Sequence, residues 1–129
     1  MRLPRAVSVA VTSAVVDSRF AGRTRLRNFR VPQVADFSTG INVRYENAMW
    51  TASTQLRVTG SQFDDDVNTR RLRRSFVVYM FGRRTLVRRA LVFVAVENVF
   101  NSEYDVGRTP TRALGLPRAV RTGVQLIFP

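Results

Sequence analysis

The 129-residue sequence contains no cysteine and no histidine, and each absence removes a class of function. Without cysteine, the chain has neither a disulfide framework nor a cysteine-based metal site. Without histidine, it lacks the commonest general base and the commonest metal-binding side chain. An enzyme built on this sequence would have to work with carboxylates and hydroxyls alone, and no nucleophile, base and oxyanion cradle occur together. We therefore predict no enzymatic activity, no cofactor and no metal site.

Long apolar runs and helical periodicity are also missing. No stretch approaches the roughly 20 apolar residues that a membrane-spanning helix needs, and no segment has a convincing 3.6-residue period. Residues 6–14 follow a basic start and weakly resemble a secretory signal peptide. The same stretch alternates Val7, Val9 and Val11 with smaller or polar side chains, and this alternation favours a strand.

Lysine is absent as well, so all 21 basic residues are arginine, and the net charge is +12. The complete lack of lysine is explained more simply by a coding bias than by a binding surface. A strong positive charge favours anionic partners. It does not choose between nucleic acid, phosphorylated lipid and acidic ligands.

Four arginines lie in one long polar segment, residues 21–32. Their guanidinium groups suit the phosphates of lipopolysaccharide or an anionic substrate. They suit a nucleic-acid backbone or plain solvent equally well. Across the chain, however, arginines occur at both ends of the predicted strands and are not gathered on one face with exposed aromatic residues, so we expect no nucleic-acid partner. The candidate anion or lipopolysaccharide contacts are Arg23, Arg25, Arg27 and Arg30.

Apolar and polar residues alternate in six segments, which is the pattern of half-buried strands. In the last of these segments, Val120, Val124 and Phe128 fall on one face, whereas Arg121 and Gln125 fall on the other. Short turns are predicted at residues 46–48 and 82–85. The predicted strands are residues 6–19 or 6–20, 34–45, 50–59, 72–81, 86–99 and 119–128.

The connections between these strands alternate long, short, long, short and long. Outer-membrane barrels join their strands by short periplasmic turns and longer external loops. An apolar face would then meet lipid, and polar-face arginines such as Arg44, Arg57 and Arg121 would meet a water-filled lumen. A soluble sheet with one solvated face fits these arginines equally. The aromatic residues predicted at the short-turn rim, as a membrane-interface girdle, are Tyr45, Trp50, Phe81 and Phe128.

Two polar clusters have structural interpretations. Asp64, Asp65 and Asp66 offer oxygen ligands for calcium, but consecutive acids lack the alternate spacing of a calcium loop. A solvated loop with ion pairs to nearby arginines is the preferred interpretation. Glu97 and Asn98 end a predicted strand, and we interpret them as packing and loop-anchoring residues.

The run from Val96 to Asn101, with Tyr104 and then residues 115–118 before the last strand, resembles the C-terminal end of a TonB-dependent outer-membrane receptor. Residues 17–20, 29–33 and 55–68 also resemble barrel strands and loops of that family. The resemblance covers nearly the whole chain and depends on the order and spacing of these motifs. One departure is that Pro129 follows Phe128, where family members usually end on an aromatic residue.

The resemblance implies an all-β fold: an antiparallel meander of about six strands, with residues 1–129 forming the C-terminal section of a transmembrane β-barrel in the bacterial outer membrane. Transporters of this class have about 22 strands, so the chain is expected to be a fragment without plug domain or earlier strands. The whole receptor would bind a scarce solute (siderophore, vitamin B12 or glycan) and contact lipid and lipopolysaccharide. It would meet an energy-transducing periplasmic partner through an N-terminal part not found in this sequence. The alternative is a small soluble basic β-domain that binds nucleic acid.

Overall fold

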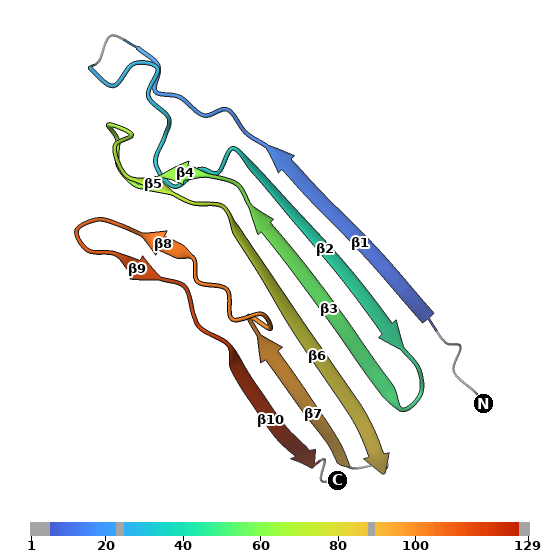
Figure 1. The fold of residues 1–129 in the computed structure, drawn as a ribbon. Helices are drawn as coiled ribbons and strands as arrows, with labels where there is room; N and C mark the ends of the chain where they lie inside the picture. Colours follow the sequence, from blue (N-terminus) through green and yellow to red (C-terminus); the bar gives the residue numbers. More distant parts are fainter. Residues whose placement is uncertain (1–5, 23–24, 88–89, 127–129) are drawn as a thin grey trace.

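The computed structural model describes residues 6–22, 25–87 and 90–126, and within these residues it contains strands and turns but no helix. None of the described segments therefore includes a helix that could cross a membrane. Six long strands form one antiparallel sheet in the order β1-β2-β3-β6-β7-β10 (Figure 1). Their bounds are β1 Ala6–Val15, β2 Phe37–Glu46, β3 Trp50–Thr59, β6 Ser75–Val87, β7 Ala90–Glu97 and β10 Ala119–Leu126.

The sheet is a meander, because each long strand pairs with the long strand before it in the chain. The predicted all-β fold of about six antiparallel strands is confirmed. Predicted and observed bounds agree closely for β3. The first strand ends at Val15, earlier than predicted, and β2 starts at Phe37 because residues 34–36 belong to the preceding loop.

One predicted turn is wrong. Residues 82–85 were expected to reverse the chain, but they continue β6, which ends at Val87. Gly82 is paired with Ala52 on one side and Val94 on the other. Both neighbouring strands thus satisfy the backbone here, and this pairing outweighs the turn preference of a Gly-Arg-Arg-Thr sequence.

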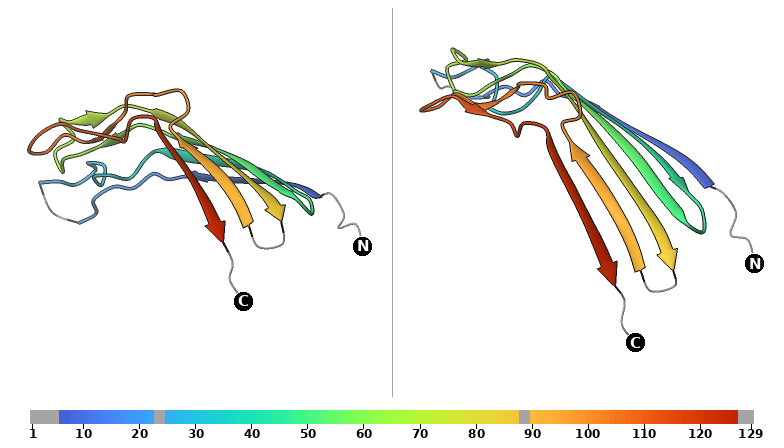
Figure 2. Two further views of the ribbon diagram at one scale, coloured as in Figure 1. Left: turned by 90° about the horizontal axis from the view of Figure 1, so that it is seen from below. Right: turned by 60° about the horizontal axis from the view of Figure 1, so that its bottom comes forward.

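The long connections carry two small hairpins at one end of the sheet, which we call the loop end (Figures 1 and 2). The hairpin of β4 Gln62–Phe63 and β5 Arg71–Leu72 lies between β3 and β6. That of β8 Asp105–Gly107 and β9 Ala113–Leu114 lies between β7 and β10. The opposite end, called the short-turn end, carries the connection of residues 47–49. The predicted order of long and short connections is confirmed.

Very little of this chain forms a packed core. Among the described residues the buried hydrophobic side chains are Leu72, Val77 and Val78, whereas 22 large hydrophobic side chains are exposed. The accessible surface is 9749 Å², compared with about 6,900 Å² for a compact monomer of this mass. The sheet therefore exposes an apolar face that needs an environment other than water.

Candidate functional site

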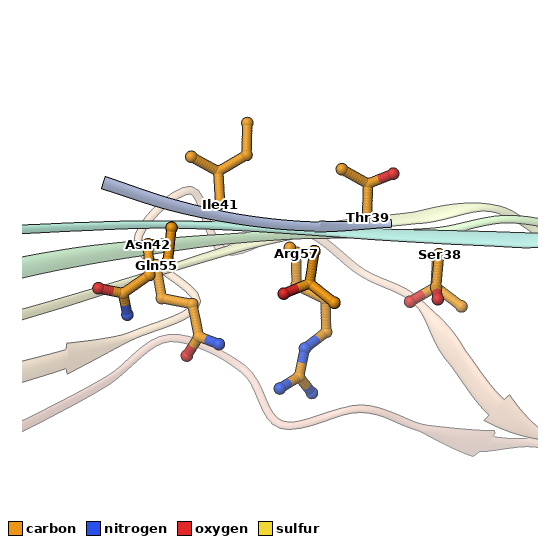
Figure 3. Close-up of a pocket in the computed structure, with 10 residues that line it drawn as sticks. Ser38, Thr39, Ile41, Asn42, Gln55 and Arg57 are labelled. Carbon is orange, nitrogen blue, oxygen red and sulfur yellow. The ribbon is translucent and has the colours of Figure 1, made fainter. Parts of the chain in front are cut away.

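The register of the six strands separates two faces of different chemistry. Val9 is opposite Val43, Ile41 is opposite Leu56, and Val92 is opposite Val124, so apolar residues of neighbouring strands share one face. Side chains alternate along a strand, and the intervening residues therefore share the other face. Figure 3 shows this division, with Ile41 and Thr39 on one side of the sheet and Arg57, Gln55 and Asn42 on the other. We call these the apolar face and the polar face.

At the short-turn end, Asn47 organises the connection between β2 and β3. Its side-chain oxygen accepts hydrogen bonds from the backbone N–H groups of Met49 (2.9 Å) and Trp50 (2.8 Å). Its amide donates to the hydroxyl of Tyr45 at 2.7 Å. Tyr45 and Trp50 are thus fixed beside the turn, and the register places both on the apolar face. Both residues thus lie beside the predicted short turn, and their role at a membrane interface stays a prediction.

The other two predicted rim aromatics do not share this position. Phe81 is opposite Ser53 and Ala95, six residues before the end of β6, and it lies on the polar face. The prediction that it lies at the rim is wrong, because the strand continues past residue 82. Its ring stacks with Phe93 at 6.4 Å between centroids. Phe128 lies outside the described residues.

The polar face carries a shallow groove of about 250 Å³ across β1, β2 and β3. Hydroxyl, amide and guanidinium groups of Ser38, Asn42, Gln55 and Arg57 lie along it (Figure 3). Arg57 also lies over the ring of Tyr79, 5.9 Å from its centroid. Hydrogen-bond donors and acceptors on this face can bind water or a polar molecule.

Two further arginines of the polar face pair with acids of their own sheet. Arg44 lies 2.9 Å from a carboxylate oxygen of Glu46. Arg121 pairs with Glu97 across the β7–β10 ladder. These pairs are partly solvated, so each stabilises the fold only slightly.

Within the described part of the chain, the candidate anion-binding arginines are not gathered into one site. Arg25 and Arg27 are exposed on a turn, whereas Arg23 lies outside the described residues. Arg30 is half-buried. Its backbone N–H donates a hydrogen bond to the side-chain oxygen of Asn68 at 2.7 Å, and its guanidinium lies 3.9 Å from the carboxylate of Asp36. Arg30 therefore helps to hold the loops together.

Asp64 and Asp65 accept hydrogen bonds that hold the loop end together. Asp64 accepts hydrogen bonds from the N–H of Arg108 (2.7 Å) and the amide of Gln33 (3.0 Å), and these bonds lower its pKa. For Asp65, burial would raise the pKa, but hydrogen bonds from Thr69 and Arg70 outweigh it and lower the pKa. Among the described residues no group of three acids could hold a metal ion.

Asp105 forms an ion cluster that the sequence did not reveal. Its side chain is 2 % exposed and lies 2.6 Å from Arg112 and 3.2 Å from Arg108. The hydrogen bond from Arg112 is the main cause of its lowered pKa, which burial opposes and the charge of Arg108 supports. This cluster fixes the β8–β9 hairpin. In the sequence, the one indication of this cluster is that Asp105 lies close to Arg108 and Arg112.

Asn98 anchors the start of the same loop, as predicted. It is 2 % exposed, and its amide donates to the carbonyls of Ser102 (2.9 Å) and Leu116 (3.0 Å). Its side-chain oxygen accepts from the N–H of Ser102 at 2.9 Å. The two ends of the 98–116 segment are thus tied at one residue.

Searches against family models and curated proteins give no match for this sequence. Solved structures do match. The ferric yersiniabactin uptake receptor FyuA from Yersinia pestis superposes with a TM-score of 0.84 at 17% identity, over 95% of this chain and 21% of the receptor. This chain has the fold of a TonB-dependent receptor barrel section. The resemblance seen in the sequence is thereby confirmed at the level of the fold.

Two other receptor structures give the same result. The ferric citrate transporter FecA matches with a TM-score of 0.81 at 18% identity, over 92% of this chain and 21% of FecA. BauA, the ferric preacinetobactin receptor from Acinetobacter baumannii, matches at 0.75 and 18% identity, over 92% of this chain and 19% of BauA. The chain thus spans about a fifth of the length of these TonB-dependent receptors.

Proposed function

We propose that this chain is a section of the wall of an outer-membrane receptor that takes up a scarce solute. The observation that carries the proposal is the apolar face that continues across all six strands, opposite a polar face. A barrel in a bilayer needs this arrangement, because its outside contacts hydrocarbon and its lumen contacts water.

The lengths of the first three long strands agree with a membrane location. β1, β2 and β3 each have 10 residues, and a transmembrane strand tilted by about 45° needs about 9–11 residues. At about 3.3 Å per residue, ten tilted residues cover about 23 Å, close to the roughly 25 Å apolar band of such barrels. The apolar face therefore has the height of a bilayer core, with Tyr45 and Trp50 at its periplasmic boundary.

In this proposal, residues 1–129 form one barrel section of a receptor whose other strands and plug lie outside this sequence. The solute is a siderophore, vitamin B12 or a glycan. A ferric siderophore is favoured, because FyuA, FecA and BauA are receptors or transporters of ferric compounds. The wall section has no enzymatic role. Energy reaches the receptor from a periplasmic partner through parts outside this chain. Exposed Arg25 and Arg27 are in position to contact lipopolysaccharide phosphates or an anionic solute.

Tryptophan fluorescence tests the assignment of the two faces. Trp50 is the only tryptophan of this chain, so its emission is isolated by comparing the full gene product with its Trp50→Phe variant. In vesicles of brominated phosphatidylcholine, Trp50 should be quenched strongly because it lies on the lipid face. A matched reporter on the polar face, Phe81→Trp in the Trp50→Phe background, should be quenched at most weakly. Equal quenching at both positions, or none at Trp50, would overturn the proposed barrel wall.

The uptake role needs its own measurement. Deleting the gene should slow growth under iron limitation when one ferric siderophore is the only iron source, and free iron salts should restore growth. If no tested siderophore separates the deletion strain from its parent while vitamin B12 or a glycan does, the receptor remains but its favoured solute is wrong.

A further inference from the structure

The apolar face carries a groove that the proposed uptake role does not use. It has a volume of about 330 Å³ and lies on β3, β6 and β7, close to the short-turn end. These strands are paired on both sides within this chain, so the groove is complete without any further strand. Its lining includes Trp50, Gly82, Arg84, Leu86, Val92 and Val94.

The groove extends toward the middle of the strands. A second hollow of about 300 Å³ shares Gly82 and Val94 with it and reaches Met80 and Val96. The floor is open at Gly82, because a Cβ placed there would contact only Val94, at 3.6 Å. From Arg84 to Met80 the strand rises by about 13 Å. The hollows together form a shallow, open apolar channel that runs from the rim toward the middle of the strands.

Arg84 gives the rim end of this channel a positive charge. The register places it opposite Trp50 on the apolar face, and its guanidinium lies over the indole, 5.0 Å from the ring centroid. It is exposed, and the ion pairs found among the described residues do not include it. Its neighbour Arg83, on the polar face, instead donates to the hydroxyl of Thr51 at 3.1 Å. An arginine on a lipid-facing surface is stable where its head reaches the phosphate level.

We propose that this groove binds one anionic glycerophospholipid of the periplasmic leaflet. The inference rests on the proposed membrane wall. The lipid phosphate contacts Arg84, and one acyl chain lies along Gly82 toward Met80. The polarity of the site matches that of a lipid in this leaflet, with the charge at the rim and the apolar channel directed into the bilayer. Stacking on Trp50 holds the guanidinium in place, so little side-chain freedom is lost when phosphate binds.

Lipid-selective quenching of Trp50 tests the site directly. The full gene product is reconstituted in unlabelled phosphatidylcholine with a small fraction of either brominated phosphatidylglycerol or brominated phosphatidylcholine. We expect brominated phosphatidylglycerol to associate about fivefold more strongly, the effect of one arginine near a membrane surface. Arg84→Gln should reduce this preference to about one. Arg83→Gln is the matched control, because it removes the same charge from the polar face and should leave the preference unchanged.

A second variant tests the acyl channel. Gly82→Val fills the hollow but leaves Arg84 in place, and it should lower the phosphatidylglycerol preference in the same assay. Equal association of both lipids with the unmodified protein, equal effects of Arg84→Gln and Arg83→Gln, or an unchanged preference in Gly82→Val would overturn the lipid site. Strong quenching without selectivity would refute the lipid site alone, whereas an absence of quenching at Trp50 would refute the barrel wall as well.

Discussion

Replacing Asn98 by alanine should open the loop between β7 and β10. Asn98 has a positive φ of 49°, and its buried side chain makes three hydrogen bonds, two to Ser102 and one to Leu116. Alanine makes none of these bonds and is disfavoured in the left-handed region. The change leaves one N–H and two carbonyl groups without their partner.

The expected cost follows from these contacts. Each hydrogen bond contributes about 1 kcal/mol net, and a side chain in the left-handed conformation costs about 1 kcal/mol more for alanine. The sum is about 4 kcal/mol. Asn101 provides a matched control, because it also has a positive φ (52°) but its side chain accepts a single hydrogen bond, from the N–H of Arg118 at 2.9 Å. Asn101→Ala should therefore cost about 2 kcal/mol.

Hydrogen exchange of the full gene product measures this local opening. About 1.4 kcal/mol corresponds to a factor of ten in an equilibrium constant. Backbone amides of residues 98–116 should therefore exchange nearly a thousandfold faster in Asn98→Ala than in the unmodified protein, and only about thirtyfold faster in Asn101→Ala. The conformational cost is common to both variants, so their difference reports the two extra hydrogen bonds. Equal acceleration in the two variants would show that Asn98 does not tie the loop.

Two further predictions concern the same loop. A Cβ at Gly115 would lie 2.0 Å from the ring of Tyr104, so Gly115→Ala should destabilise the protein by about 1–3 kcal/mol and lower its thermal midpoint. Gly40→Ala, which has nothing within 4 Å, should leave the midpoint nearly unchanged, and equal shifts would contradict this packing. The pKa of Asp105 is lowered below 3.8 in the fold, so its stabilisation is present above about pH 4 and is lost as pH falls through the folded pKa. Pepsin cleavage in the loop should be measured for the unmodified protein and for Asp105→Asn. The ratio of the first cleavage rate to the second should rise as pH falls from about 4 to about 2. A constant ratio would refute the role of the charge.

Strand identity could be predicted from the sequence where side-chain alternation is uninterrupted. In β3, Trp50 to Thr59, the large apolar residues Trp50, Leu56 and Val58 fall on one face, and the predicted bounds are those observed. In β6 the Gly82-Arg83-Arg84 sequence has the local chemistry of a turn, but pairing to β3 and β7 keeps it extended. That pairing is a non-local property, so the misplaced turn and the wrong position of Phe81 have one common cause.

Positions in the candidate sites could be predicted only where they depend on residues close together in the sequence. Tyr45 and Trp50 could be placed at the rim because both flank the same short turn. The groove beside Arg84 could not be predicted, because it is formed by Trp50, Gly82 and Val94 on three strands and depends on their register. The buried position of Asp105 likewise depends on the folding of its own loop against Arg112.

The meander order has a consequence for how this wall assembles. Each long strand pairs only with the long strands next to it in the chain, so the sheet can grow one strand at a time without threading any segment past another. Each new strand pairing closes only the one loop that joins the two strands, so the conformational entropy lost at each step is small. An ordered ribbon of hairpins can therefore form before a distant pair of edges meets. If the sheet is part of the proposed barrel, joining the edge strands β1 and β10 to further strands should be the slowest step, because that closure is the least local.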